Sequence, residues 1–172
     1  MIAGAEYYQP SCGERKVESS EFESAKVRAL RILGTRSLSM REIEKRLVGK
    51  GESVDIARQT VSWLEETGLI NDMEYANSIV SHYISKGYGI ARVKDELYKR
   101  GIDREMWEEA LSGVGEMEDA ACNYIEKKLK GSNDKDEMRR VTNALCRRGF
   151  SYEEACGAMN RYLESLEESE DI

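Results

Sequence analysis

The sequence predicts an all-α protein built as an elongated tandem array of three three-helix repeats. From Ala25 onward, apolar residues recur at intervals of three and four, which is the period of an amphipathic helix, and no segment keeps the alternation of a strand. A basic residue followed by glycine ends a similar predicted helix three times, at Lys50-Gly51, Arg100-Gly101 and Arg148-Gly149. The single proline, Pro10, precedes all three repeats, so no later helix contains the residue that breaks helices most strongly.

The first repeat is predicted over residues 25–70. Apolar stripes indicate three short helices, over residues 25–33, 40–47 and 56–64. The segment Ser39-Met-Arg-Glu42 fits a capping box, in which the serine and glutamate side chains satisfy free backbone N–H groups at a helix start. Gly51 and Gly68 follow the second and third stripes, where a left-handed residue commonly ends a helix.

The same pattern returns over residues 71–115 and 116–163, which are predicted as the second and third repeats. Four residues before the three glycines, the sequence has Leu47, Leu97 and Leu145. Two residues after the glycines, it has the N-cap types Ser53, Asp103 and Ser151. Agreement at so many offsets indicates an internal repeat. Because one such unit buries little apolar surface alone, each repeat is expected to depend on its neighbours for stability.

The acidity of the chain is concentrated at its two ends. The whole sequence has a net charge of −7, from 26 lysines and arginines against 33 acidic residues. Residues 1–24, predicted as a flexible acidic N-terminal segment, hold two bases and five acids; residues 164–172, predicted as an acidic C-terminal tail, hold five acids and no base. The repeats between these ends are nearly neutral, at +1. The total charge argues against a tight, autonomous DNA binder.

Residue types that carry enzyme chemistry are scarce. The single histidine, His82, disfavours a Ser–His–Asp triad and a zinc site with several histidine ligands. The four cysteines contain no C-x-x-C pair, so half-buried, reduced thiols are expected instead of a metal site. The sequence therefore predicts a protein that is not an enzyme, with no catalytic residue, no metal, no cofactor and no small-molecule substrate.

The N-terminus lacks the basic and apolar pattern of a secretory signal, and no stretch approaches the ~20 apolar residues of a membrane span. We expect a cytoplasmic monomer with no membrane partner.

Basic residues recur on or just after the middle helix of each repeat, away from the apolar stripe. We define this set as the basic ridge and predict that it contacts a partner or DNA; its members are Lys45, Arg46, Arg92, Lys94, Lys99, Arg100, Arg139 and Arg140. The alternative is that these bases only solubilise the helices and match the negative ends of the helix dipoles. Trp63 and Trp107 are predicted in the core, and Tyr88 is the aromatic residue expected to be exposed.

Two segments resemble motifs of the RecX family. Gly68-Leu-Ile-Asn-Asp72-Met-Glu-Tyr75-Ala76 is similar to the family's junction motif. Residues 86–102 are similar to its central signature, K-G-x-G-x-x-R-[IV]-x-x-E-L-x-x-[KR]-G-[IV]. The resemblance extends over about residues 25–163 and is weaker in the third repeat.

The resemblance implies a regulator of the bacterial recombinase RecA. Such a protein would bind RecA–single-stranded DNA filaments in their helical groove, inhibit ATP hydrolysis and strand exchange, and so modulate recombination, DNA repair and the SOS response. Single-stranded DNA would be an indirect or weak partner, since many family members are distinctly basic and this chain is acidic overall. Two alternatives stay open: an autonomous DNA-binding module of helix-turn-helix-like units, and a scaffold for another protein.

Overall fold

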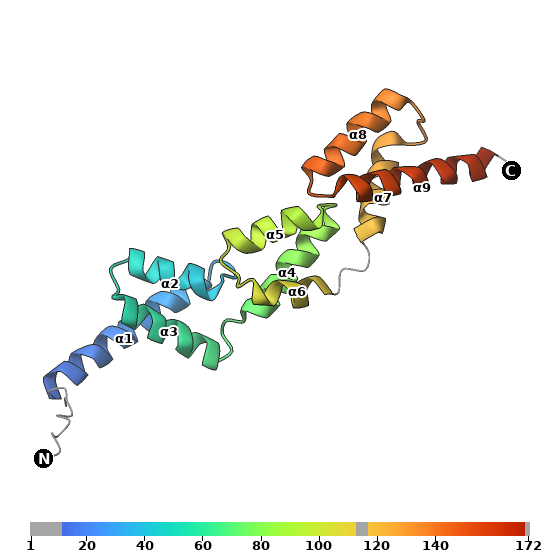
Figure 1. The fold of residues 1–172 in the computed structure, drawn as a ribbon. Helices are drawn as coiled ribbons and strands as arrows, with labels where there is room; N and C mark the ends of the chain where they lie inside the picture. The colour runs from blue at the N-terminus through green and yellow to red at the C-terminus, as the bar shows by residue number, and fades with distance from the viewer. Residues whose placement is uncertain (1–11, 113–116, 171–172) are drawn as a thin grey trace, which may run out of the picture. The chain divides into compact units, whose positions relative to one another are not determined.

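The computed structural model describes residues 12–112 and 117–170, and over these residues the chain forms nine α-helices and no strand (Figure 1). The helices are α1 (Cys12–Leu33), α2 (Met40–Gly49), α3 (Val54–Glu66), α4 (Asp72–Ser85), α5 (Ile90–Lys99), α6 (Glu105–Ser112), α7 (Met117–Leu129), α8 (Lys135–Arg147) and α9 (Tyr152–Glu170). The predicted all-α architecture of repeated helix triplets is confirmed.

The chain divides into two compact units. The first, Met1–Asn71, contains α1, α2 and α3; the second, Asp72–Ile172, contains the other six helices. Within the second unit the two helix triplets meet through α4 and α7. The second and third repeats therefore pack together in one compact unit.

The basic-glycine pairs end the middle helices α2, α5 and α8 with the same hydrogen-bond motif. Gly51, Gly101 and Gly149 have φ angles of 98°, 72° and 95°, a left-handed conformation that suits glycine. The residue after each glycine donates a backbone hydrogen bond to the helix carbonyl five residues earlier, at Leu47 (3.1 Å), Leu97 (3.1 Å) and Leu145 (3.2 Å). This is the Schellman motif, and it explains why the basic-glycine pair recurs in register.

The predicted helix starts are also present. At α2, the Glu42 N–H donates to Ser39 Oγ (3.1 Å) and the Ser39 N–H donates to the Glu42 carboxylate (3.3 Å), which completes the capping box. Ser151 and Glu154 make the same reciprocal pair at α9. These side chains satisfy N–H groups that the helix itself leaves free.

Three apolar cores hold the three helix triplets together. Each is centred on the repeated leucine, and Leu47, Leu97 and Leu145 are all 0% exposed. Trp63 and Trp107 are partly buried against the first and second cores, as predicted. The cores are small, so single buried leucines carry a large share of the stability of each triplet.

Both predicted acidic ends are more helical than expected. Residues 12–24 are the first turns of α1, since no glycine or proline interrupts the sequence from Glu14 to Leu33; residues 1–11 lie outside the described part of the chain. Residues 164–170 continue α9, and Leu166, one helical turn after the buried Tyr162, packs against the third core. Over these residues, the predicted acidic ends are therefore continuous with α1 and α9.

A close backbone contact joins the second and third repeats. The Gly89 N–H donates to the Arg148 carbonyl (3.0 Å), and the Ala91 N–H donates to the Gly149 carbonyl (3.2 Å). A Cβ atom on Gly89 would overlap the Gly149 carbonyl, and one on Gly149 would lie 2.5 Å from the Arg92 nitrogen. Only glycines allow this approach, which we call the glycine joint.

Replacing Leu97 with alanine should lower the free energy of unfolding of the second unit by about 2–5 kcal/mol, because the change leaves a cavity in its core. Urea denaturation followed by circular dichroism measures this loss. Tyr98→Ala on the same helix is the matched control, since Tyr98 is 66% exposed. Equal stabilities of the two variants would contradict the assignment of the buried face of α5.

Replacing Gly89 with alanine should destabilise the glycine joint, because the added methyl group overlaps backbone that has no side-chain freedom to move away. We expect a loss of about 1–3 kcal/mol in the same denaturation assay. Gly157→Ala on α9 is the control: apart from the neighbouring residues and backbone of its own helix, no described atom lies within 4 Å of its Cβ position, so the replacement should be neutral or stabilising. A neutral Gly89→Ala variant would show that the joint can open without cost.

Candidate functional site

The basic ridge separates into an outward group and an inward group. Lys45, Lys94 and Arg140 are exposed, and within the described part of the chain no carboxylate lies within salt-bridge distance of them. Half-buried Arg46 likewise makes no ion pair there, and exposed Arg139 pairs with Asp136 at 3.2 Å on the surface of α8. Exposed pairs of this kind are weak, so these five bases are available to a partner.

The inward group surrounds a single buried carboxylate on α5. Glu96 is only 8% exposed, and its oxygens lie 3.3 Å from Arg92, 3.2 Å from Lys99 and 3.9 Å from Arg100. Arg92 and Glu96 are the arginine and glutamate of the central signature, spaced four residues apart so that they meet on one helix face. These three members of the basic ridge therefore compensate a buried charge and are less available to a partner than the sequence predicts.

The surroundings of Glu96 stabilise its ionised form. Burial by itself raises the pKa of the carboxyl, but the hydrogen bonds from Lys99 and Tyr83 and the charges of Lys99 and Arg92 outweigh that effect. The pKa of Glu96 therefore lies below its ordinary value of 4.5. The carboxylate stays charged at neutral pH, where it holds the three bases.

Arg100 is the most strongly positioned base of the inward group. Its guanidinium donates to the Tyr75 hydroxyl at 2.7 Å and lies 5.8 Å from the centre of the Tyr75 ring. Burial by itself lowers the pKa of Arg100, but the hydrogen bonds and charge interactions with Tyr75 and Tyr83 together outweigh burial and raise the pKa, so the side chain remains protonated. Tyr75 belongs to the junction motif, and this contact links the two motifs of the resemblance in one structure.

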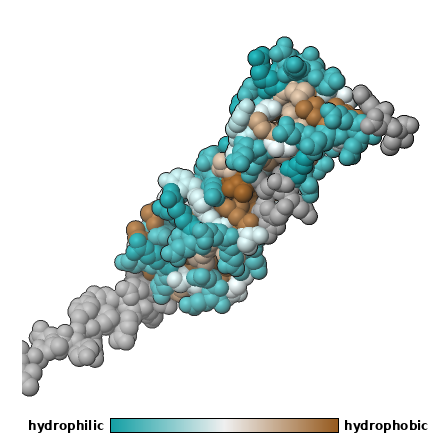
Figure 2. Space-filling model, turned by 45° about the vertical axis from the view of Figure 1, so that its right-hand side comes forward, coloured by the Kyte–Doolittle hydropathy of each residue, from teal (hydrophilic) through white to brown (hydrophobic). Residues whose placement is uncertain are grey.

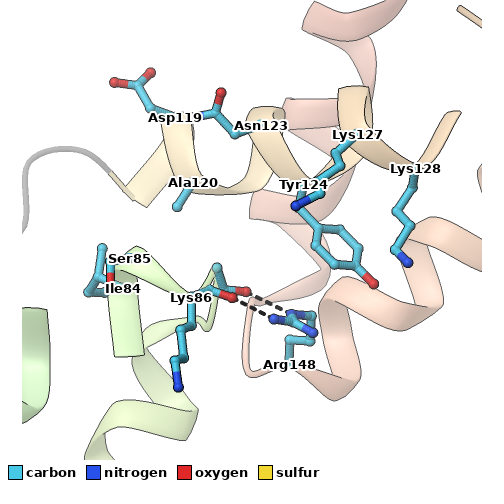
Figure 3. Close-up of a pocket in the computed structure, with 11 residues that line it drawn as sticks. Ile84, Ser85, Lys86, Asp119, Ala120, Asn123, Tyr124, Lys127, Lys128 and Arg148 are labelled. Carbon is cyan, nitrogen blue, oxygen red and sulfur yellow. Dashed lines mark hydrogen bonds between the residues drawn. The ribbon is translucent and has the colours of Figure 1, made fainter. Parts of the chain in front are cut away.

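A second cationic site, which no sequence pattern predicts, lies in the second unit. Arg148 crosses to the loop between α4 and α5, where its guanidinium donates to the carbonyls of Gly87 (2.8 Å) and Lys86 (2.6 Å) (Figure 3). The Tyr88 and Tyr124 rings lie 4.3 Å and 4.7 Å from it. Tyr88 is thus half-buried, and its predicted exposure is wrong, because the arginine of the next repeat covers it.

Among the described residues, no group of three histidine, cysteine or acidic side chains is placed to hold a metal ion. Half-buried Cys122, Cys146 and Cys156 form no disulfide within the described part of the chain. None of the described helices is long and apolar enough to cross a membrane.

The visible face of each unit in Figure 2 is mainly hydrophilic with small apolar patches, which suits polar and charged contacts.

The Glu96 cluster predicts a specific dependence of stability on pH. Because the pKa of Glu96 is lower in the folded state than in the unfolded state, its contribution is present at neutral pH and is lost as pH falls below about 4.5. Glu96→Gln should cost about 1–3 kcal/mol at pH 7 and less at acidic pH. Urea denaturation across pH 3–7 measures the difference, with Asp95→Asn, an exposed neighbour, as the control. A pH-independent difference would contradict the cluster.

Comparison with known proteins matches this chain to one family. A sequence model described as "RecX, second three-helix domain" matches residues 71–111. The Regulatory protein RecX of Chromohalobacter salexigens is 30% identical over 133 residues, covering 76% of this chain and 88% of the relative. The protein of the same name from Mycobacterium avium is 30% identical over 146 residues, covering 81% and 84%.

The fold agrees with solved structures. A crystal structure of RecX from Lactobacillus salivarius superposes with a TM-score of 0.76 at 23% identity, covering 84% of this chain and 97% of that chain. A second RecX crystal structure gives a TM-score of 0.69 at 20% identity. At these identities the structures show a shared fold, while the sequence relatives show shared descent over most of their length. The chain, with its two signature motifs built around Tyr75, Arg92 and Glu96, belongs to the RecX family of regulatory proteins.

Proposed function

We propose that this chain is a non-enzymatic regulator of the RecA recombinase, which binds RecA–single-stranded DNA filaments in their helical groove. Binding there inhibits RecA's ATP hydrolysis and strand exchange and so modulates recombination and DNA repair. The proposal is supported by the relatives named Regulatory protein RecX and by what the family resemblance implies. The observation that carries it is the presence, on all three middle helices, of exposed bases that make no salt bridge with any described residue, at Lys45, Lys94 and Arg140.

Repetition of weak contacts explains how such a surface can act on a filament. A filament has a groove that repeats along its helical axis, and each helix triplet of this chain has its own exposed bases. One exposed charge contact is worth about 0–1 kcal/mol. When contacts are made on one chain, the second and third form at a high effective concentration and so strengthen binding together. The protein needs no cofactor for this role and acts as a cytoplasmic monomer.

Co-sedimentation with RecA filaments tests the proposal. The chain should pellet with RecA assembled on single-stranded DNA, and it should do so more than with either RecA alone or DNA alone. An autonomous DNA-binding module would instead bind duplex DNA without RecA, with an affinity that falls steeply as salt increases. Pelleting that is unchanged by the presence of RecA would therefore contradict filament binding and favour the module.

Reversing the charge of Lys45 and Lys94 together should weaken inhibition of RecA's DNA-dependent ATPase by about tenfold. Both side chains are exposed and form no salt bridge with the described part of the chain, so K45E/K94E keeps the Glu96 cluster and the three cores intact. The estimate takes about 0.7 kcal/mol for each lost contact. The measurement is the concentration of the variant that halves the ATPase rate.

The matched control is R31E/K135E, which makes the same change in net charge at exposed positions outside the basic ridge. The two variants should have the same helicity by circular dichroism. If both inhibit RecA as strongly as the unaltered chain, the basic ridge is only a solubilising surface.

A further inference from the structure

The second unit contains an open cleft that lies outside the basic ridge. It has a volume of about 530 Å³ and is formed by the end of α4 and the following loop, by one side of α7, and by Arg148 at the end of α8. Its charged members are Lys86, Lys127, Lys128, Arg148 and Asp119. The cleft is therefore lined by four cations and one carboxylate. Figure 3 shows that Asp119 points away from Arg148, whereas Lys86 and Lys128 extend on either side of Arg148.

Arg148 is a fixed cation at the centre of this cleft. Two backbone carbonyls hold its Nε and one terminal nitrogen, at 2.8 Å and 2.6 Å, and two tyrosine rings pack against its plane. Within the described residues no carboxylate is close enough to form a salt bridge with it. The carbonyls and rings orient the guanidinium but leave its net positive charge in place.

We propose that this cleft binds the phosphodiester backbone of single-stranded nucleic acid without reading its bases. Lys86, Arg148 and the Lys127–Lys128 pair would meet successive phosphates. The inference deepens the proposed function, on which it rests for the choice of a single strand, because it assigns a direct DNA contact to the second unit.

The covered tyrosines explain why bases would not be read. Proteins that grip single strands commonly stack bases on free aromatic faces. Here Tyr88 and Tyr124 already pack on Arg148, and the Lys128 ammonium lies 5.8 Å from the centre of the Tyr124 ring. Tyr124 is thus occupied by two cations. The cleft therefore has the cations of a single-strand binding site, but its two tyrosine rings already pack against cations and do not serve for base stacking.

The arrangement of the cations favours a nucleic-acid strand over an acidic peptide. They come from three different segments and follow one another across an open cleft. A strand carries one charge at every nucleotide along a continuous line, so it can meet all of them in turn. An acidic peptide holds its charges on flexible side chains, and ordering each of these costs conformational entropy. Contacts to a strand also gain from the release of its bound counterions.

Fluorescence anisotropy with a labelled 20-nucleotide dT strand, in the absence of RecA, tests the site. The variant is K127A/K128A, because both lysines are exposed and neither makes a hydrogen bond or salt bridge within the described residues, whereas Arg148 also holds the loop. Affinity should fall by about tenfold at low salt, and the slope of log K against log salt should decrease by about 1.4, since each lost phosphate contact removes about 0.7. The control R31A/K135A removes the same charge, with Lys135 at the opposite end of α8 from Arg148, and should bind more tightly than K127A/K128A.

Two further probes decide the identity of the occupant. A dA strand of the same length should bind within about twofold of dT, because the aromatic faces that would favour the more strongly stacking base are covered. A poly-glutamate peptide of equal charge should bind more weakly than either strand. Equal loss of affinity in both double variants, a clear preference for dA, or stronger binding of the peptide would overturn the proposal. Because RecA is absent, failure here leaves the filament test unaffected, and failure of the filament test leaves this site standing.

Discussion

The close approach of two backbones at Gly89 and Gly149 is the constraint on which the organisation of the second unit depends. Two main-chain hydrogen bonds cross the glycine joint, at 3.0 and 3.2 Å, and neither position has room for a Cβ atom. Because the backbones meet there, Arg148, which precedes Gly149, lies against the loop before Gly89. Its guanidinium donates there to the carbonyls of Lys86 and Gly87. The same contact therefore fixes the packing of two repeats and places a cation at the centre of the cleft.

The structure assigns different tasks to bases that look equivalent in the sequence. Lys50, Arg100 and Arg148 occupy the same place before a helix-ending glycine. Lys50 remains exposed, Arg100 turns inward to Tyr75 beside the buried Glu96, and Arg148 joins two repeats. The same position in the repeat therefore has three different roles. The base ends a helix in the first repeat, compensates a buried charge in the second, and packs one repeat against another in the third, because the neighbouring segments differ. The bases of the basic ridge that remain for an outside partner are those that do not compensate the buried Glu96 carboxylate.

Local patterns predicted most of the fold, and contacts between distant segments account for what was missed. Helix periodicity, the capping box at Ser39 and the basic-glycine pairs depend on neighbours within a few residues, so the sequence could predict them. The cover on Tyr88 comes from Arg148, sixty residues further along the chain, and no local pattern indicates it. Charge composition indicated an acidic tail after Tyr162 but not its helix, in which the apolar Leu166 continues the packed face of α9. Of the basic ridge, the sequence could locate the residues on the middle helices but not the Glu96 carboxylate that engages Arg92, Lys99 and Arg100.

The net charge of −7 and a site for a polyanion are compatible because charge acts over a limited range in salt. At physiological ionic strength the Debye length is about 8 Å, so exposed acidic groups further away than this contribute little to the potential at a given phosphate. The charges close to the phosphate therefore determine the potential there. In the cleft these are four cations and one carboxylate, and the carboxylate points away from Arg148. The overall acidity still reduces long-range attraction to free DNA and slows encounter. Contacts of this kind therefore act best on a strand that another protein already holds close by, where encounter no longer limits binding.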